Sequence, residues 1–341
     1  MSFNYIWSRL SDGTAPHYDY AAAAVGTNFF LFGGVASDGS LLNDFWSYDS
    51  AIGTWTSLLN GTVSARSGAS ATAIGSDFYV FGGFDGSSYK NNLYKHSSGS
   101  WGLKTSLTPD NLGRSHHTAV TIGSDMLVFG GKNTTTVFSD LRQYDPSVGQ
   151  NGTWSHLSDG ATSRYKHSAV AIGTQMFVFA GLDQNGSDLS DLYVYNYSDN
   201  TWAQLGTGPS PRHSHAAAAI GPDMYIEGGV NISGTEFSDL WQYNTTSDVW
   251  TQLVTTGNIT ARNGCIAVNI SDKIVIFGGT SNNNSDGAKN DLWELSITSA
   301  PEIIPSSTKT SPSFAWIIIA IGAVLVIAVI IVLIDRRRRS V

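Results

Sequence analysis

The chain has 341 residues, with 36 Gly, 10 Trp, 14 Tyr and 15 Phe, and only 13% of its residues are charged. Glycine suits tight turns and aromatic residues suit half-buried strands, so this composition favours one large all-β domain over long solvated helices. Residues 1–313 carry 15 Lys and Arg against 26 Asp and Glu, a net charge of −11, which argues against nucleic acid as a partner.

The first predicted element is a strand at residues 5–10 (YIWSRL), and a repeat of about 48 residues fills the chain from there to residue 298. In each unit a short apolar run is followed by a glycine pair, which is Ala-Gly instead of Gly-Gly in the fourth unit. They lie at Gly33-Gly34, Gly82-Gly83, Gly130-Gly131, Ala180-Gly181, Gly228-Gly229 and Gly278-Gly279. Tryptophans follow the same period at Trp7, Trp55, Trp101, Trp154, Trp202 and Trp250.

Each unit has the pattern of four short strands. In the fourth unit these are predicted at 167–173, 175–181, 191–196 and 201–205, separated by Gly, Asn, Asp and Ser. Six four-stranded sheets in one chain predict a six-bladed β-propeller over residues 5–298.

The recurring residues resemble the kelch repeat, whose marks are a double glycine, an aromatic-polar pair and a later tryptophan. The third unit has Gly130-Gly131, Tyr144-Asp145 and Trp154 in this order. The second and sixth units depart from the pattern, with His96 and Leu295 at the tyrosine position. The resemblance covers about 290 residues. It implies a propeller whose binding face is formed by loops around the central channel.

The sixth unit lacks its last strand. After Gly279 it has only DLWELSI (291–297) and no tryptophan, whereas residues 5–10 carry Trp7 with no repeat before it. We therefore expect the N-terminal strand to complete the last blade, which removes exposed strand edges.

The kelch resemblance implies a loop face made of two sets of loops. One set connects the second and third strands of each unit, at residues 35–43, 84–91, 132–139, 182–190, 230–238 and 280–290. The other precedes each first strand and presents Asp19, Gly68, His116, Lys166, Ser214 and Gly264 beside Arg66, Arg114, Arg164, Arg212 and Arg262. The candidate binding residues are these arginines together with Asp19, His116, Lys166 and Ser214. Arginines facing one funnel would attract an acidic peptide or a glycan; alternatively they bond neighbouring blades.

Signs of catalysis are few. Cys265 is the single cysteine, which excludes an intramolecular disulfide and a cysteine-based zinc site, and no HExxH motif occurs. His117, His167 and His215 occupy one position in three successive units, which suggests either a metal site or, as their repetition favours, a structural role. A kelch-type copper oxidase would need a cysteine cross-linked to tyrosine, for which only Cys265 is available. We expect no enzyme activity, no cofactor and no metal.

Glu227 breaks the pattern of the repeat. The residue before the glycine pair is Phe32, Phe81, Phe129, Phe179 or Phe277 in the other units. A carboxyl group in an aromatic position costs free energy unless it is paired or solvated. Glu227 at this position therefore predicts either a functional pocket or an exposed strand end.

The C-terminal part is predicted as a membrane anchor. Residues 299–313 are a Pro-, Ser- and Thr-rich stalk, 314–334 are uncharged and almost wholly apolar, and 335–341 form a basic tail with four consecutive arginines. A helix over 314–334 would span about 30 Å at ~1.5 Å per residue.

Two topologies are open. The basic tail places the C-terminus in the cytosol and the propeller outside by the positive-inside rule, which we favour. Ten glycosylation sequons support this, at Asn60, Asn133, Asn151, Asn185, Asn196, Asn231, Asn244, Asn258, Asn269 and Asn283. However, residues 1–30 contain no signal-peptide pattern, and a helix this close to the end is typical of a tail-anchored protein with a cytosolic propeller.

The expected function is that of a single-pass membrane protein, adhesion- or receptor-like, whose loop face binds a protein or glycan and whose apolar segment contacts the lipid bilayer. The alternatives are a tail-anchored cytosolic interaction scaffold and, less favoured, a propeller enzyme with a metal or acid–base site. The sequence does not indicate the oligomeric state.

Overall fold

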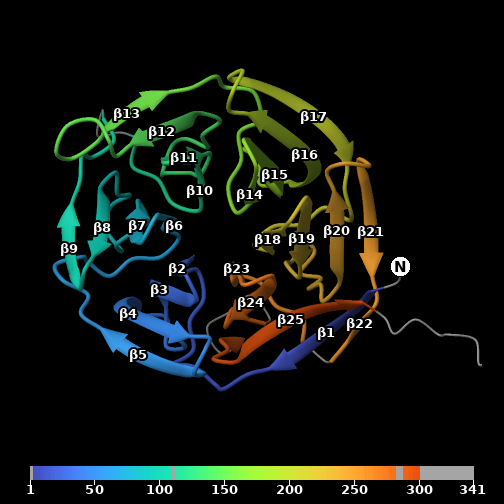
Figure 1. Cartoon of the computed structure of the whole chain (residues 1–341). Helices are drawn as coiled ribbons and strands as arrows, with labels where there is room; N and C mark the ends of the chain where they lie inside the picture. The colour runs from blue at the N-terminus through green and yellow to red at the C-terminus, as the bar shows by residue number, and fades with distance from the viewer. Residues whose placement is uncertain (1–2, 109–111, 258, 282–286, 300–341) are drawn as a thin grey trace, which may run out of the picture. The chain divides into compact units, whose positions relative to one another are not determined.

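The computed structural model describes residues 3–108, 112–257, 259–281 and 287–299. Ser2–Thr298 form one compact unit. Six sheets surround a central channel (Figure 1), so the predicted all-β, six-bladed propeller is confirmed.

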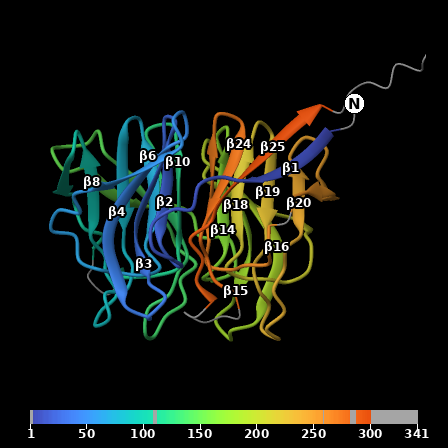
Figure 2. The same cartoon turned by 90° about the horizontal axis from the view of Figure 1, so that it is seen from below.

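Blades 1 to 5 are antiparallel meanders, and the first strand of each blade lies nearest the channel (Figure 1). Figure 2 shows the same blades turned by 90°. Blade 1 consists of β2 (Ala21–Val25), β3 (Asn28–Val35), β4 (Leu41–Asp49) and β5 (Thr54–Leu58). Blade 2 consists of β6 (Ser70–Ile74), β7 (Asp77–Phe81), β8 (Leu93–Ser97) and β9 (Ser100–Leu103). Blade 3 consists of β10 (Thr118–Ile122), β11 (Asp125–Phe129), β12 (Leu141–Asp145) and β13 (Thr153–His156).

The other three blades complete the circle. Blade 4 consists of β14 (Ser168–Ile172), β15 (Gln175–Leu182), β16 (Asp188–Asn196) and β17 (Thr201–Thr207), close to the strands predicted for the fourth unit. Blade 5 consists of β18 (Ala216–Ile220), β19 (Asp223–Glu227), β20 (Leu240–Asn244) and β21 (Val249–Leu253). Blade 6 consists of β23 (Ile266–Ile270), β24 (Lys273–Phe277), β25 (Leu292–Ser299) and β1 (Phe3–Arg9), with the short β22 (Thr255–Thr256) outside β1.

Aromatic contacts between blades explain the period of the repeat. The phenylalanine that precedes the glycine pair of one blade packs on the tryptophan in the outer strand of the next blade. The ring centroids are 4.9 to 5.4 Å apart in the pairs Phe32–Trp101, Phe81–Trp154, Phe129–Trp202, Phe179–Trp250 and Phe277–Trp55. Burial of each such side chain contributes about 1.5–3 kcal/mol.

The N-terminal strand closes the propeller, as predicted. In the last sheet β1 lies beside β25, and the backbone N–H of Leu10 donates to the carbonyl of Leu292 at 2.8 Å. Trp7 is only 4% exposed and belongs to the apolar cluster between blades 5 and 6. Strand β22 pairs with β1 in parallel, with Tyr5 opposite Thr255, so both edges of β1 are bonded.

The predicted stalk, membrane helix and basic tail lie outside the described residues, apart from Ser299 at the end of β25. Among the residues that the structure does describe, no helix has the length and apolarity to cross a bilayer.

Candidate functional site: the loop face of the propeller

The five arginines predicted for binding are not on the loop face but inside the protein. They are 0–1% exposed. Arg164, for example, donates to both carboxylate oxygens of Asp191, at 2.7 and 2.9 Å, and to the carbonyl of Ala180 at 2.9 Å. The binding hypothesis is therefore wrong for Arg66, Arg114, Arg164, Arg212 and Arg262, and the alternative, that they bond the blades, describes their contacts.

The other loop-face candidates do come together. One residue just before the inner strand of every blade joins a closed circle of backbone hydrogen bonds, in which each N–H donates to the carbonyl of the equivalent residue one blade earlier. The six bonds measure 2.7 to 2.9 Å. We call this circle the mouth ring; its members are Asp19, Gly68, His116, Lys166, Ser214 and Gly264.

The backbone of the mouth ring is left-handed throughout. The φ angles are +61° at Gly68 and +66° at Gly264, and +52° to +55° at the four residues that carry side chains. This region is unfavourable for residues other than glycine, and such residues persist in it only where the surroundings fix them. Here the circle of hydrogen bonds fixes them, and the four side chains are held in place at the channel entrance.

Two of these side chains meet across the mouth. His116 Nε2 donates to Asp19 Oδ2 at 3.3 Å, and His116 Nδ1 and Ser115 Oγ share a hydrogen bond of 3.0 Å. The contact passes over Gly68, where an added Cβ would lie 3.0 Å from the imidazole of His116. Burial alone would raise the pKa of Asp19, but the hydrogen bond from His116 and the charges of His116, Lys166 and His213 lower it to about 2.

Further residues lie beside the mouth ring on blades 3 to 5, and they were not singled out from the sequence. The Lys132 ammonium lies over the ring of Tyr165, 4.6 Å from its centroid. His213 Nδ1 donates to Asp188 Oδ1 at 2.6 Å, and Asp188 also accepts from the backbone of Ile232, whose side chain is 66% exposed. Tyr165 and His213 directly precede members of the mouth ring, so their position in the repeat is the signal that could have identified them.

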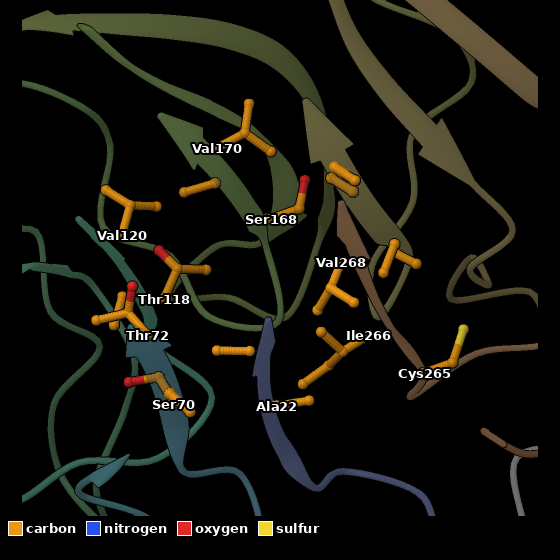
Figure 3. Close-up of a pocket in the computed structure, with 18 of the residues that line it drawn as sticks. Ala22, Ser70, Thr72, Thr118, Val120, Ser168, Val170, Cys265, Ile266 and Val268 are labelled. Carbon is orange, nitrogen blue, oxygen red and sulfur yellow. The ribbon is translucent and has the colours of Figure 1, made fainter. Parts of the chain in front are cut away.

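The channel below the mouth ring is a cavity of about 450 Å³. Its wall is formed by the inner strands, which carry alanine at one shared position because the blades converge there; these alanines are Ala22, Ala71, Ala119, Ala169, Ala217 and Ala267. Ser70, Thr72, Thr118 and Ser168 lie among apolar side chains in this wall (Figure 3). The Thr72 and Thr121 hydroxyl groups bond each other at 2.8 Å, so part of the polar lining is already satisfied.

The three histidines considered for a metal lie between different pairs of blades. His167 Nε2 bonds Thr118 Oγ1 at 2.9 Å, His215 Nε2 bonds Ser168 Oγ at 2.7 Å, and His117 stands edge-on to Phe81. Burial lowers the pKa of all three well below the usual value. Within the described ranges, no three His, Cys, Asp or Glu residues are grouped so as to hold a metal ion.

The predicted sequons differ in their surroundings. Asn151 and Asn185 are exposed, the second on the loop face. Asn269, however, lies in β23 on the channel wall, and its side-chain amide donates to the carbonyl of Ala219 at 2.6 Å, so this position is unsuited to a glycan. Five other sequon asparagines are half-buried, namely Asn60, Asn133, Asn196, Asn231 and Asn244. The last two, Asn258 and Asn283, lie outside the described residues.

The fold and this face define a β-propeller with a loop-borne surface at one end of its channel. Residues 116–327 match the family described as KLHDC2/KLHL20/DRC7 Kelch-repeats domain, and residues 4–190 match the Attractin/LZTR1 beta-propeller family. The chain therefore belongs to the kelch-repeat β-propellers, a class of protein-interaction modules. No curated protein matches the chain.

Proposed function

We propose that this protein is a membrane-anchored kelch propeller that binds a protein partner through its loop face. The observation that carries the proposal is the mouth ring. It holds Asp19, His116, Lys166 and Ser214 in left-handed backbone conformations at the channel entrance, and all four remain half-buried rather than packed between blades. Polar side chains on a rigid scaffold with fixed positions suit recognition.

The chemistry of the surrounding surface supports a protein partner. Within the described part of the chain the Lys166 ammonium makes no ion pair, and the Lys132 ammonium lies over the ring of Tyr165 without an acidic partner. Two acidic side chains, Asp188 and Glu236, lie on the neighbouring blades, bonded to His213 and Asn263. Aromatic side chains are enriched at protein interfaces, and charges of both signs allow electrostatic complementarity to a protein partner.

Anchoring is the second part of the proposal. It rests on the uncharged segment 314–334 and on the four arginines that follow it, which favour a cytosolic C-terminus and an external propeller. An external adhesion- or receptor-like protein would meet its partner outside the cell or in a luminal compartment.

The binding proposal is tested by comparing two lysine variants of the full chain for capture of partners from membrane extracts. Lys166 is in the mouth ring, whereas Lys273 starts β24 at the opposite face and is 47% exposed. Lys166→Ala should weaken capture of a specific partner about fivefold or more, and Lys273→Ala should leave it unchanged. Equal capture by both variants would reject the loop face as the binding surface.

Topology is tested separately with an N-glycosidase on the full chain expressed in cells. An external propeller predicts a drop in apparent mass, with one glycan lost in Asn151→Gln and one in Asn185→Gln. Asn269→Gln should change nothing, because that amide lies on the channel wall. A chain without any glycan would favour the tail-anchored scaffold and leave the binding proposal standing.

A further inference from the structure

The junction between blades 5 and 6, here called seam 5–6, differs from the other five junctions. Elsewhere a phenylalanine closes the space between neighbouring blades and packs on a tryptophan. At seam 5–6 the equivalent position is Glu227, the last residue of β19. The sequence predicted a functional pocket or an exposed strand end here; the side chain is in fact only 2% exposed, so the second interpretation is wrong.

The Glu227 carboxyl group lies in apolar surroundings without a hydrogen-bond partner. Both of its oxygens are buried and unbonded. Its partners across the sheet are Ala216 and Leu240, and both belong with Trp7 and Cys265 to the apolar cluster that fills seam 5–6. The polar groups of this cluster, such as the Trp7 indole N–H and the Tyr225 hydroxyl, make no hydrogen bond to the carboxyl group.

The charged groups nearest to Glu227 are already committed to each other. Arg212 donates to both oxygens of Asp239, at 2.6 and 2.9 Å, and Arg262 donates to both oxygens of Asp291, at 2.8 and 2.9 Å. Burial raises the pKa of Glu227 to about 8. The charges of Arg262 and Arg212 act to lower this pKa, but the charges of Asp239 and Asp291 oppose them. An ionised carboxylate in this space would have no counterion of its own.

We propose that seam 5–6 is the place where the propeller opens, and that release of the Glu227 proton to solvent opens it. The bonds that opening would break include two between backbones: Gly264 N–H donates to Ser214 at 2.9 Å within the mouth ring, and Gly229 N–H donates to Arg262 at 2.8 Å. Two side-chain amides also donate across the seam, Asn269 to the carbonyl of Ala219 at 2.6 Å and Asn263 to Glu236 at 2.8 Å. Opening would hydrate the carboxylate and break the mouth ring, which changes the loop face.

The reactivity of the Cys265 thiol can be used to measure this opening. Cys265 is its single cysteine, it is 4% exposed, and it lies in the apolar cluster of seam 5–6. The charge of Glu227 contributes to the raised pKa of its thiol, about 12, after burial itself. Cys265 also lines the channel wall (Figure 3) but is almost fully buried, so we expect a thiol reagent to label it slowly in the closed propeller and faster once the seam opens.

The test is the rate at which a thiol reagent labels Cys265 in the full chain from pH 5 to 9, compared with Glu227→Gln. The thiolate fraction of the open state depends on pH in the same way in both proteins, so the ratio of the two rates isolates Glu227. The ratio of wild-type to variant should rise about tenfold per pH unit up to about pH 8 and then level off. A ratio independent of pH would overturn the proposal.

A matched variant distinguishes opening of one seam from global unfolding. Ala69 holds in blade 2 the position that Cys265 holds in blade 6, and it is 8% exposed. In the double variant Cys265→Ala with Ala69→Cys, the only thiol lies between blades 1 and 2. Opening at seam 5–6 predicts that this thiol is labelled at least tenfold more slowly at pH 8 than Cys265. Equal labelling of the two positions would show that the whole propeller unfolds, and would also overturn the proposal.

Discussion

Arg212 holds Asp239 through two parallel hydrogen bonds, Nη1 to Oδ1 at 2.6 Å and Nη2 to Oδ2 at 2.9 Å, and Nη1 also donates to the carbonyl of Gly228 at 3.0 Å. Its own carbonyl accepts from the backbone N–H of Gly181 in blade 4, at 2.9 Å. One residue thus joins two blades. The same backbone bond at the last junction runs from Gly279 to His17, which stands in the arginine position and bonds Asp44.

Arg212→Ala should therefore lower the free energy of unfolding by about 3–5 kcal/mol, because Asp239 would remain charged and half-buried without its partner. The measurement is denaturant unfolding of the full chain. Arg9→Ala is the control, since Arg9 and Asp12 form an ion pair with both side chains 52% exposed, and its loss should cost about 0–1 kcal/mol. Similar losses in both variants would contradict the structural role assigned to the buried arginines.

Blade 2 offers the reverse experiment. Arg66 meets Asn92 where the other arginines meet aspartate, through a single Nη1–Oδ1 bond of 2.9 Å. Asn92→Asp would supply a second charge-assisted bond, and we expect about 1 kcal/mol of added stability at pH 7. A melting temperature equal to or below that of the wild type would show that a carboxylate at residue 92 is not compensated there.

Trp7 provides a test of how the propeller closes. Trp7→Ala should destabilise the protein by about 3–5 kcal/mol, because it leaves a cavity between blades 5 and 6 at the strand that completes the circle. Ile6→Ala on the same strand removes a side chain that is 37% exposed and should cost far less. Thermal unfolding of both variants is the measurement. An unchanged melting temperature for Trp7→Ala would disprove closure by β1.

Glu227 gives the stability of the propeller a predictable dependence on pH. Its pKa is raised from about 4.5 to about 8 in the folded protein. The free energy of unfolding is therefore highest below pH 4.5 and falls as the pH rises from 4.5 to about 8. The loss is on the order of 5 kcal/mol at ~1.36 kcal/mol per pKa unit. Glu227→Phe, which restores the residue of the other blades, should remove this dependence in melting curves recorded from pH 4 to 9. If the melting temperatures of the two proteins changed with pH in the same way, this role of Glu227 would be refuted.

Much of the fold is predictable from the sequence because the repeat is a packing requirement. The glycine pair, phenylalanine and tryptophan recur wherever two blades meet, and Trp7 without a preceding repeat identifies the closing strand. Gly33 shows why the pair is needed: at its φ of +64°, an added Cβ would lie 2.9 Å from the carbonyl of Arg66 in blade 2.

The candidate site was less predictable, because two positions that lie close together in each repeat have different surroundings in the folded protein. Arg164 and Lys166 are two residues apart, yet the first is fully buried against Asp191 and the second is half-exposed in the mouth ring. The partner Asp191 belongs to an Asp-Leu pair that recurs in four units, at Asp140, Asp191, Asp239 and Asp291, but this pair was not connected with the arginines from the sequence alone. Lys132 and Tyr165 come from neighbouring blades, so only the folded structure brings them together.

The most direct test of the central claim, binding through the loop face, is photo-crosslinking of the full chain in cells. A photoreactive phenylalanine derivative replaces Ile232 on the loop face in one variant and Ile52 at the opposite face in another; the two side chains are 66% and 71% exposed. The account predicts that a discrete protein partner is crosslinked from position 232 and not from position 52. Crosslinking of that partner from position 52 alone would contradict it.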